Sequence, residues 1–258
     1  MSDKAAKANQ QHWERMVKER CGYTIPWLDL DIALLRQYAA SEVAFLPEPL
    51  TCMFPPSILV DVASKDILCL ASGGGQQSAV FGLLGARVTV VDLVEGQLEG
   101  DRKAAAHYGY EIAAFQADMR NLSCLDDSTF DLVYQANSIG YVPDVRQVYA
   151  EVARVLRPNG RYRVVHGNPA TAFISWDGQA YCISKPYGER LNRREGAIDF
   201  RHYMDDIFNG LLDVGLSIQR VYEAPYHRMG DPKAKPGSWD HERAYVAGEF
   251  AIVAKKGK

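Results

Sequence analysis

Few cysteines, little net charge and no long apolar run characterise this sequence. Its five cysteines, at positions 21, 52, 69, 124 and 182, are scattered and form no Cys-x-x-Cys pair, so we expect neither a disulfide scaffold nor a metal site. The 29 basic and 32 acidic residues leave a formal net charge of -3, which favours no nucleic-acid partner. No apolar stretch approaches the length of a membrane span, and the polar N-terminus shows no signal peptide. These absences predict a cytoplasmic protein without a membrane partner.

The chain does contain the alternation of strands and helices that is typical of an open α/β fold. Its 258 residues, of which 47% are apolar, suit one well-buried domain with appended segments. Short connections between successive elements favour a parallel sheet with helices on both faces. The expected strands are 66–70, 88–91, 111–117, 130–135, 161–165, 217–222 and 249–254, and the helices between them are 95–108, 145–156 and 204–214.

Two regions lie outside this alternation. Residues 1–63 read as a helical cap that precedes the main domain, 64–258. The aromatic-rich insert 167–202 and the proline-rich segment 224–245 show no clear periodicity, and long loops of this kind are usually functional or disordered. Because the insert leaves the fifth strand at the edge where ligands bind in open sheets, we expect it to form part of a lid over the substrate.

The most informative segment is a glycine loop after the first strand. The apolar run 66–70 leads into Gly73-Gly74-Gly75, and the next strand ends on Asp92. Three glycines let the backbone turn sharply and let a ligand approach where a Cβ would clash. An acidic residue at the end of the second strand suits the two hydroxyls of a ribose. This pattern predicts an adenosine-containing cofactor.

Four features together resemble the class I S-adenosylmethionine-dependent methyltransferases over residues 64–166. They are the loop 71–75, the carboxylate of Asp92, the triplet 117–119, and the Leu-Arg-Pro-Asn-Gly turn at 156–160 before the fifth strand. The chain departs from the family pattern at Cys69, which replaces an acidic residue, and at Ala71 and Asn159, which replace glycines. The resemblance implies S-adenosylmethionine as the cofactor. The expected fold is a doubly wound, Rossmann-like sheet of seven strands, mostly parallel with an antiparallel last strand.

The resemblance also implies roles for individual residues. Asp92 would accept hydrogen bonds from the ribose and Asp118 from the adenine amino group, while Met119 would pack on the adenine ring. A helix-capping aspartate and an ordinary polar turn are the alternative interpretations of Asp92 and Asp118. The remaining expected cofactor-binding residues are Ala71, Ser72, Gly73, Gly75, Gln77, Leu93 and Asn137.

Methyl transfer is an in-line displacement at an activated sulfonium, so the protein mainly has to orient the two reactants. A base is needed only if the acceptor must lose a proton. His166 and His202 are the candidates by position, with a structural histidine as the alternative for each. Five aromatic side chains are candidates for the wall of a substrate pocket, with core packing as the alternative: Trp13, Tyr23, Tyr141, Trp176 and Tyr181.

Two other functions remain open at this point. The spacing Gly73-x-Gly75-x-x-Ser78 resembles the fingerprint of NAD(P)-dependent oxidoreductases, and a non-catalytic S-adenosylmethionine-binding protein would show the same loop. No Asn/Asp-Pro-Pro-aromatic motif follows the fourth strand, which argues against transfer to the nitrogen of a base or an amide. We therefore expect a small organic metabolite to be methylated on O, N or C. Nothing in the sequence indicates an oligomeric state.

Overall fold

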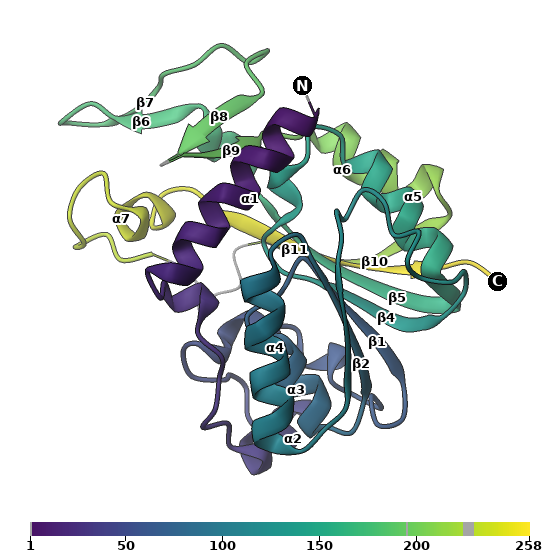
Figure 1. The fold of residues 1–258 in the computed structure, drawn as a ribbon. Coiled ribbons are helices and arrows are strands. Elements are labelled where there is room, and N and C mark those ends of the chain that lie inside the picture. Colours follow the sequence, from purple (N-terminus) through teal and green to yellow (C-terminus); the bar gives the residue numbers. More distant parts are fainter. Residues whose placement is uncertain (1, 195, 224–229) are drawn as a thin grey trace.

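A seven-stranded sheet forms the centre of the molecule (Figure 1). The computed structural model describes residues 2–194, 196–223 and 230–258. The strand order is β10-β11-β5-β4-β1-β2-β3, and β11 alone is antiparallel to its two neighbours. This confirms the mostly parallel sheet with an antiparallel last strand. The strands are β1 Asp66–Leu70, β2 Arg87–Asp92, β3 Ile112–Gln116, β4 Phe130–Gln135, β5 Leu156–Gly167, β10 Leu216–Glu223 and β11 Glu249–Lys256.

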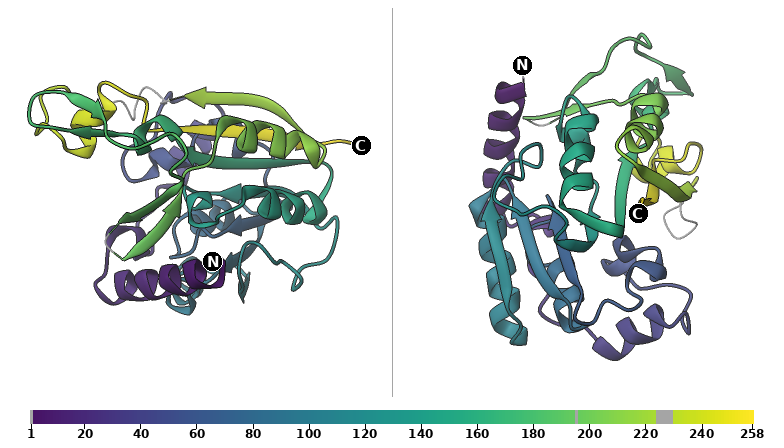
Figure 2. Two further views of the ribbon diagram at one scale, coloured as in Figure 1. Left: turned by 90° about the horizontal axis from the view of Figure 1, so that it is seen from above. Right: turned by 90° about the vertical axis from the view of Figure 1, so that its right-hand side faces the viewer.

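Helices cover both faces of this sheet, as the two views of Figure 2 show. Alternate side chains of each central strand point to opposite faces. Leu68 of β1 therefore packs with α5 and α6, and Ile67 packs with α2 and α3. The helices are α1 Ser2–Lys18, α2 Ile32–Ala39, α3 Gln77–Leu83, α4 Glu95–Tyr108, α5 Val145–Val155, α6 Met204–Asp213 and α7 Trp239–Arg243.

The N-terminal cap shares the core of the sheet. Leu35 of α2 and Met53 and Ile58 of two single-turn helices are fully buried, and they belong to the same apolar cluster as Ile67 and Val80. The cap is thus packed onto the α3 side of the sheet, and its boundary at residue 63 stays a prediction. The single-turn helices are η1 Gly22–Thr24, η2 Leu50–Met53, η3 Pro56–Ile58, η4 Ile139–Tyr141 and η5 Pro169–Ala172.

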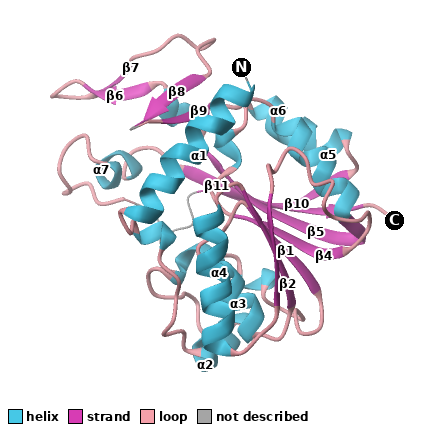
Figure 3. Cartoon of the chain, viewed as in Figure 1, coloured by secondary structure: helices cyan, strands magenta, loops and turns pink. Residues whose placement is uncertain are grey.

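The segment after β5 differs from the expected irregular loop. It forms two antiparallel hairpins, which lie apart from the main sheet (Figure 3). Trp176 pairs with Tyr181 in the first and Leu191 with Phe200 in the second, so aromatic and apolar cross-strand pairs supply the stabilisation that periodicity did not reveal. The expectation of a loop without secondary structure was therefore wrong. The hairpin strands are β6 Ile174–Trp176, β7 Tyr181–Ile183, β8 Leu191–Arg194 and β9 Ala197–Phe200.

Two further expectations need adjustment. Strand β5 begins at Leu156, directly after α5, instead of at Arg161. The turn expected at 156–160 lies within this strand, where the pairing of β5 with β4 is irregular. Asn159 has a φ of 66° in this turn. The proline-rich segment 224–245 contains α7, while its residues 224–229 lie outside the described part of the chain. None of the described helices has both the length and the apolar character needed to cross a membrane.

Candidate active site

A cavity of about 560 Å³ lies at the carboxyl ends of β1, β2 and β4. This is where open α/β sheets bind ligands, and the volume is within the usual range for small-molecule sites. The three strands contribute residues 71–73, 92–94 and 136–138. Residues of the cap and of the C-terminal part complete the wall, among them Trp13, Tyr23, Trp27, Glu48, Pro49, Thr51, Cys52 and Trp239.

Buried carboxylates hold the glycine loop at the edge of this cavity. Asp101 of α4 accepts hydrogen bonds from the backbone N–H groups of Gly74 and Gly75, both at 3.0 Å, and from the hydroxyl of Ser78 at 2.5 Å. Burial raises the pKa of Asp101 to about 7, although these three donors oppose the shift. The conformation of the loop therefore depends on an acidic side chain from the following helix.

Glycines allow α4 to approach the loop this closely. A Cβ on Gly75 would lie 2.3 Å from the carbonyl oxygen of Gly100, and a Cβ on Gly100 would lie 2.9 Å from the backbone of Gly74. On the same helix, a Cβ on Gly96 would lie 2.9 Å from Val17 of α1. Two glycines one helical turn apart thus let α4 contact both the loop and α1.

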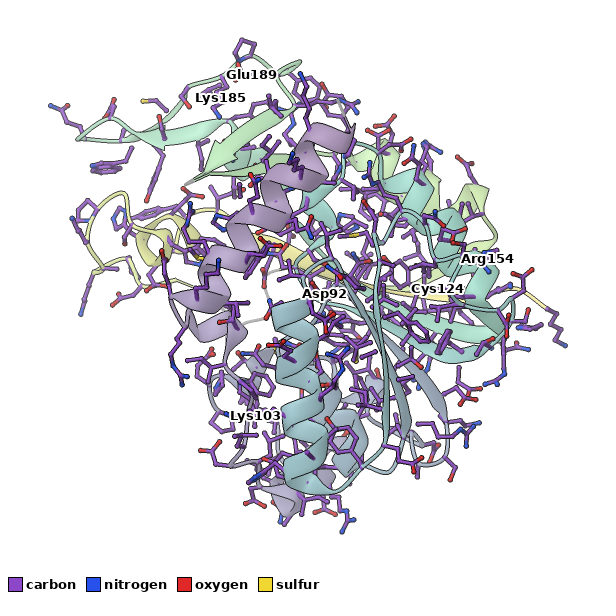
Figure 4. All side chains as sticks on the ribbon, viewed as in Figure 1. Asp92, Lys103, Cys124, Arg154, Lys185 and Glu189 are labelled. Carbon is purple, nitrogen blue, oxygen red and sulfur yellow. The ribbon has the colours of Figure 1, made fainter. Side chains whose placement is uncertain are left out.

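Asp92 and Gln97 present oxygens on the cofactor side of the cavity. Asp92 lies at the end of β2 near the start of α4 (Figure 4). Its carboxylate accepts the N–H groups of Gly73 at 3.1 Å and Val94 at 3.0 Å, and burial raises its pKa to about 6. The buried Oε1 of Gln97 has no hydrogen-bond partner among the described residues. Such an orphaned acceptor is costly unless a ligand or water satisfies it.

Helix α1 contributes Asn9 and Trp13 to the wall of this cavity. Asn9 is buried, and its amide group bonds to the backbone of Ile198 in β9 at 2.7 and 2.8 Å and to the carbonyl of Tyr141 at 3.3 Å. Gln10 donates to the carbonyl of Leu93 at 3.4 Å. The cap, the second hairpin and the loop after β4 are therefore joined above the site.

Comparison with known proteins bears on the chemistry of this site. The family model described as "Methyltransferase domain" matches residues 68–164. The uncharacterized methyltransferase YbaJ of Bacillus subtilis (strain 168) is 31% identical over 185 residues, which cover 66% of this chain and 71% of that protein. The chain belongs to the class I S-adenosylmethionine-dependent methyltransferases. The ubiquinone biosynthesis O-methyltransferase of Azotobacter vinelandii is a more distant relative, 27% identical over 56% of this chain and 60% of its own length.

Solved structures share the fold of this methyltransferase. An S-adenosylmethionine-dependent methyltransferase from Mesorhizobium loti superposes with a TM-score of 0.65 at 24% identity, over 78% of this chain and 94% of its own. Geranyl diphosphate C-methyltransferase from Streptomyces coelicolor gives 0.64 at 16% identity, over 98% of both chains. Together with the family model and the Bacillus relative, these matches identify the protein as an S-adenosylmethionine-dependent methyltransferase and not as an oxidoreductase.

The residues at the glycine loop fit this cofactor. A Cβ on Gly73 would lie 2.9 Å from the carboxylate of Asp92 and 2.7 Å from Gln97, so only glycine leaves room for a ligand beside these oxygens. The lone pairs of Asp92 that accept no backbone N–H suit the hydroxyls of a ribose. The orphaned Oε1 of Gln97 suits an ammonium group. We propose that Asp92 holds the ribose of the methyltransferase cofactor.

Most of the residues expected from the sequence to bind the cofactor lie together in the methyltransferase cavity. Those that line it are Ala71, Ser72, Gly73, Gln77, Asp92, Leu93, Met119 and Asn137. Asp118 lies instead in a small adjoining hollow that shares several of these walls. Burial acts to raise the pKa of Asp118, but the guanidinium of Arg120, 2.5 Å away, outweighs burial and holds it below the usual value. Gly75 does not line the cavity; it packs against α4 behind the loop.

The two candidate bases occupy structural positions. His166 is buried, bonds to the hydroxyl of Tyr149 at 2.8 Å and stacks on Phe250. His202 bonds to the carbonyl of Val142 at 2.8 Å. Burial lowers the pKa of both imidazoles. Both line a polar cavity of about 350 Å³ that adjoins the large cavity at Asn137 and Trp239. We therefore do not propose either histidine as the base of the methyltransferase.

The five aromatic candidates divide into two groups. Trp13, Tyr23 and Tyr141 line the large cavity. Trp176 and Tyr181 pack against each other and against His241 of α7, with ring centroids 5.1 to 5.5 Å apart, and line none of the cavities described here. The first hairpin thus uses its aromatic residues for packing against α7.

Sequence reasoning missed several residues of the site. Asp101 carried one available signal, because glycines at 96 and 100 repeat at helical spacing directly before it and indicate close packing. Gln97, Arg163 and Glu249 also line the cavity, but no local motif marks them.

The raised pKa of Asp101 predicts a pH dependence of stability. Since the fold favours the protonated form, Asp101 contributes stability that is fully present below its ordinary pKa of 3.8 and is lost as the pH rises through about 7. The free energy of unfolding that is lost in this way is at most about 4 kcal/mol. In urea unfolding at several pH values between 4 and 7, the stability advantage of the wild type over Asp101→Asn is expected to shrink as the pH rises. A difference that stays constant over this interval would contradict the prediction.

Proposed function

We propose that this enzyme transfers the methyl group of S-adenosylmethionine to a small organic metabolite. The observation that carries the proposal is the shape of the cavity, which continues from the glycine loop into a half walled by aromatic residues of the cap. Trp27 and Tyr134 are buried there, and Trp13 meets Tyr141 edge to face with centroids 6.1 Å apart. The cap, the carboxyl ends of the central strands and Trp239 of α7 together leave a space of about 560 Å³, which suits a compact acceptor rather than a polymer.

The residues of this chain would act mainly by positioning. S-adenosylmethionine supplies a methyl group that is already activated by the positive sulfonium. Ser72 accepts the N–H of Ala136 at 3.0 Å, and so ties the glycine loop to the end of β4, where the acceptor would lie. Holding two reactants in line is the largest contribution a protein can make to such a displacement. The atom methylated is O, N or C, and a cytoplasmic location is part of the proposal.

An unbiased methylation assay tests the size of the acceptor. Purified enzyme and methyl-labelled S-adenosylmethionine are incubated with a metabolite extract, with total RNA and with total protein, in separate reactions. We expect label to appear in molecules that pass a filter of roughly 3 kDa, a cut-off well above the mass of the drug-sized ligands that a cavity of this volume encloses. Label found only in RNA or protein would refute the proposal. Asp92→Ala, which is expected to bind the cofactor more weakly, is run in all three reactions at subsaturating S-adenosylmethionine, where its labelling should fall below that of the wild type.

A further inference from the structure

Arg163 of β5 is a buried cation in the acceptor half of the cavity. Its side chain is 2% exposed and lines the cavity together with Cys52, Tyr134 and Val165. Its guanidinium donates to three backbone carbonyl oxygens, those of Phe54 at 3.0 Å, Gln135 at 3.1 Å and Cys52 at 2.8 Å. A guanidinium has five N–H donors, so two remain after these bonds.

The charge of Arg163 is not paired with a carboxylate in the described part of the chain, although Glu48 and Glu249 line the same cavity. No ion pair with it occurs there, and its three acceptors are neutral. The face of the guanidinium lies over the ring of Tyr134, with 4.7 Å between its central carbon and the ring centroid. Burial raises the pKa of Tyr134 well above its usual value, so this phenol stays neutral. Neutral dipoles offset only part of the cost of burying a charge.

The surroundings of Arg163 suit a ligand with an apolar body. Trp27, Tyr134 and Val165 supply apolar surface, and Gln77, which is buried, places an amide near the sulfur of Cys52, 3.7 Å away. A ligand with its apolar body between these walls would place an anionic oxygen near Arg163, which keeps two unused donors. Guanidinium groups bind carboxylates in such a paired geometry more tightly than they bind neutral acceptors.

We propose that the acceptor of this methyltransferase is a molecule with an apolar body and a carboxylate, and that Arg163 is the residue that binds this carboxylate. The inference rests on the proposed function and narrows its substrate class. The methionine carboxylate of the cofactor has the same chemistry, so the experiment has to separate the two sources.

The test measures binding of matched probes to protein saturated with S-adenosylhomocysteine. The probes are benzoate, salicylate and anthranilate, each compared with its own carboxamide. Binding is followed by calorimetry and by tryptophan fluorescence, because Trp13, Trp27 and Trp239 line the cavity. We expect at least one carboxylate to bind roughly 10- to 100-fold more tightly than its amide, as for other hydrogen bonds to a charged group.

Variants of Arg163 show whether this preference depends on it. Arg163→Gln is expected to abolish the preference for the carboxylate, and Arg163→Lys, which keeps the charge, to retain part of it. Arg161→Gln is the matched control, because Arg161 lies on the same strand but lines a different cavity and bonds to the carbonyl of Ser57. If Arg163→Gln does not fold, two comparisons still test the proposal: acid against amide on the wild type, and the same pair of probes on Arg163→Lys.

Three outcomes would overturn the inference: equal binding of acid and amide, no binding of any carboxylate at 10 mM, roughly the weakest measurable affinity, or a preference that survives in folded Arg163→Gln. A fourth would be weaker binding of S-adenosylhomocysteine by Arg163→Gln with the probe preference intact, which would assign the residue to the cofactor. In each case label transfer to small metabolites would still support the proposed function. Label transfer only to polymers would instead remove that function.

Discussion

Replacing Asp92 by alanine is expected to weaken the binding of S-adenosylmethionine about 5- to 150-fold, which corresponds to about 1 to 3 kcal/mol. The buried carboxylate accepts two backbone N–H groups and still has free lone pairs for the hydroxyls of a ribose. Removal of these acceptors would leave both the ligand and the N–H of Gly73 without a partner. Calorimetric titration with S-adenosylmethionine and S-adenosylhomocysteine measures the effect directly.

Two controls separate a loss of ligand contacts from a general loss of structure. Asp66→Ala removes a carboxylate from the opposite end of the neighbouring strand β1, where it pairs with Arg87 at 2.7 Å, and should leave cofactor affinity unchanged. Asp92→Asn keeps the shape but not the charge, and should fall between wild type and alanine. If folded Asp92→Ala binds the cofactor as tightly as the wild type, Asp92 does not hold the ribose.

The second large effect is expected from alanine at Gly75. The new Cβ would lie 2.3 Å from the carbonyl oxygen of Gly100, so the loop or α4 has to move. Gly109 is a matched control because it has the same φ of 75°, while its Cβ would meet nothing within 4 Å. Both variants carry the cost of a left-handed backbone at a residue with a Cβ. Because of the additional clash, the free energy of unfolding of Gly75→Ala should be lower than that of Gly109→Ala by about 1 to 3 kcal/mol.

Urea unfolding of the two variants measures this difference, and calorimetry shows whether cofactor binding is lost with it. We expect Gly75→Ala to bind S-adenosylmethionine poorly even where it is folded, because Gly73 and Gly74 belong to the same loop. Equal stabilities of the two variants would mean that α4 can withdraw without cost, which would contradict the role given to the glycine pair at 96 and 100.

Much of the fold was predictable because it depends on local patterns. The strands follow from apolar runs whose alternate side chains face opposite layers, as Ile67 and Leu68 do. The glycine loop and Asp92 lie on consecutive parallel strands, so their distance in the sequence determines that they meet at one sheet edge. For this reason the cofactor half of the cavity, including Ser72 and Met119, agrees closely with the residues expected to line it.

The acceptor half was not predictable in the same way. For Trp13 and Tyr181 a pocket wall and core packing were equally open, yet Trp13 lines the cavity and Tyr181 packs against α7. An aromatic side chain gains from burial in either place, and only the path of the chain decides which one it reaches. The hairpins of the insert likewise depend on cross-strand pairs such as Trp176 with Tyr181. The pair Asp177-Gly178 between these two strands is a turn signal, but strands of three residues are too short to show a periodicity.

The sequence by itself determined the sheet, the glycine loop, the carboxylate of Asp92 and the family. Only the tertiary structure decided that His166 is held by Tyr149 away from the large cavity, and that Arg163 reaches it. Arg163 acquires its partners from residues more than 100 positions earlier in the chain, at 52 and 54, as well as from Gln135. Local propensity sets the conformation of the backbone, but the burial and charge environment of a side chain arise from such distant contacts.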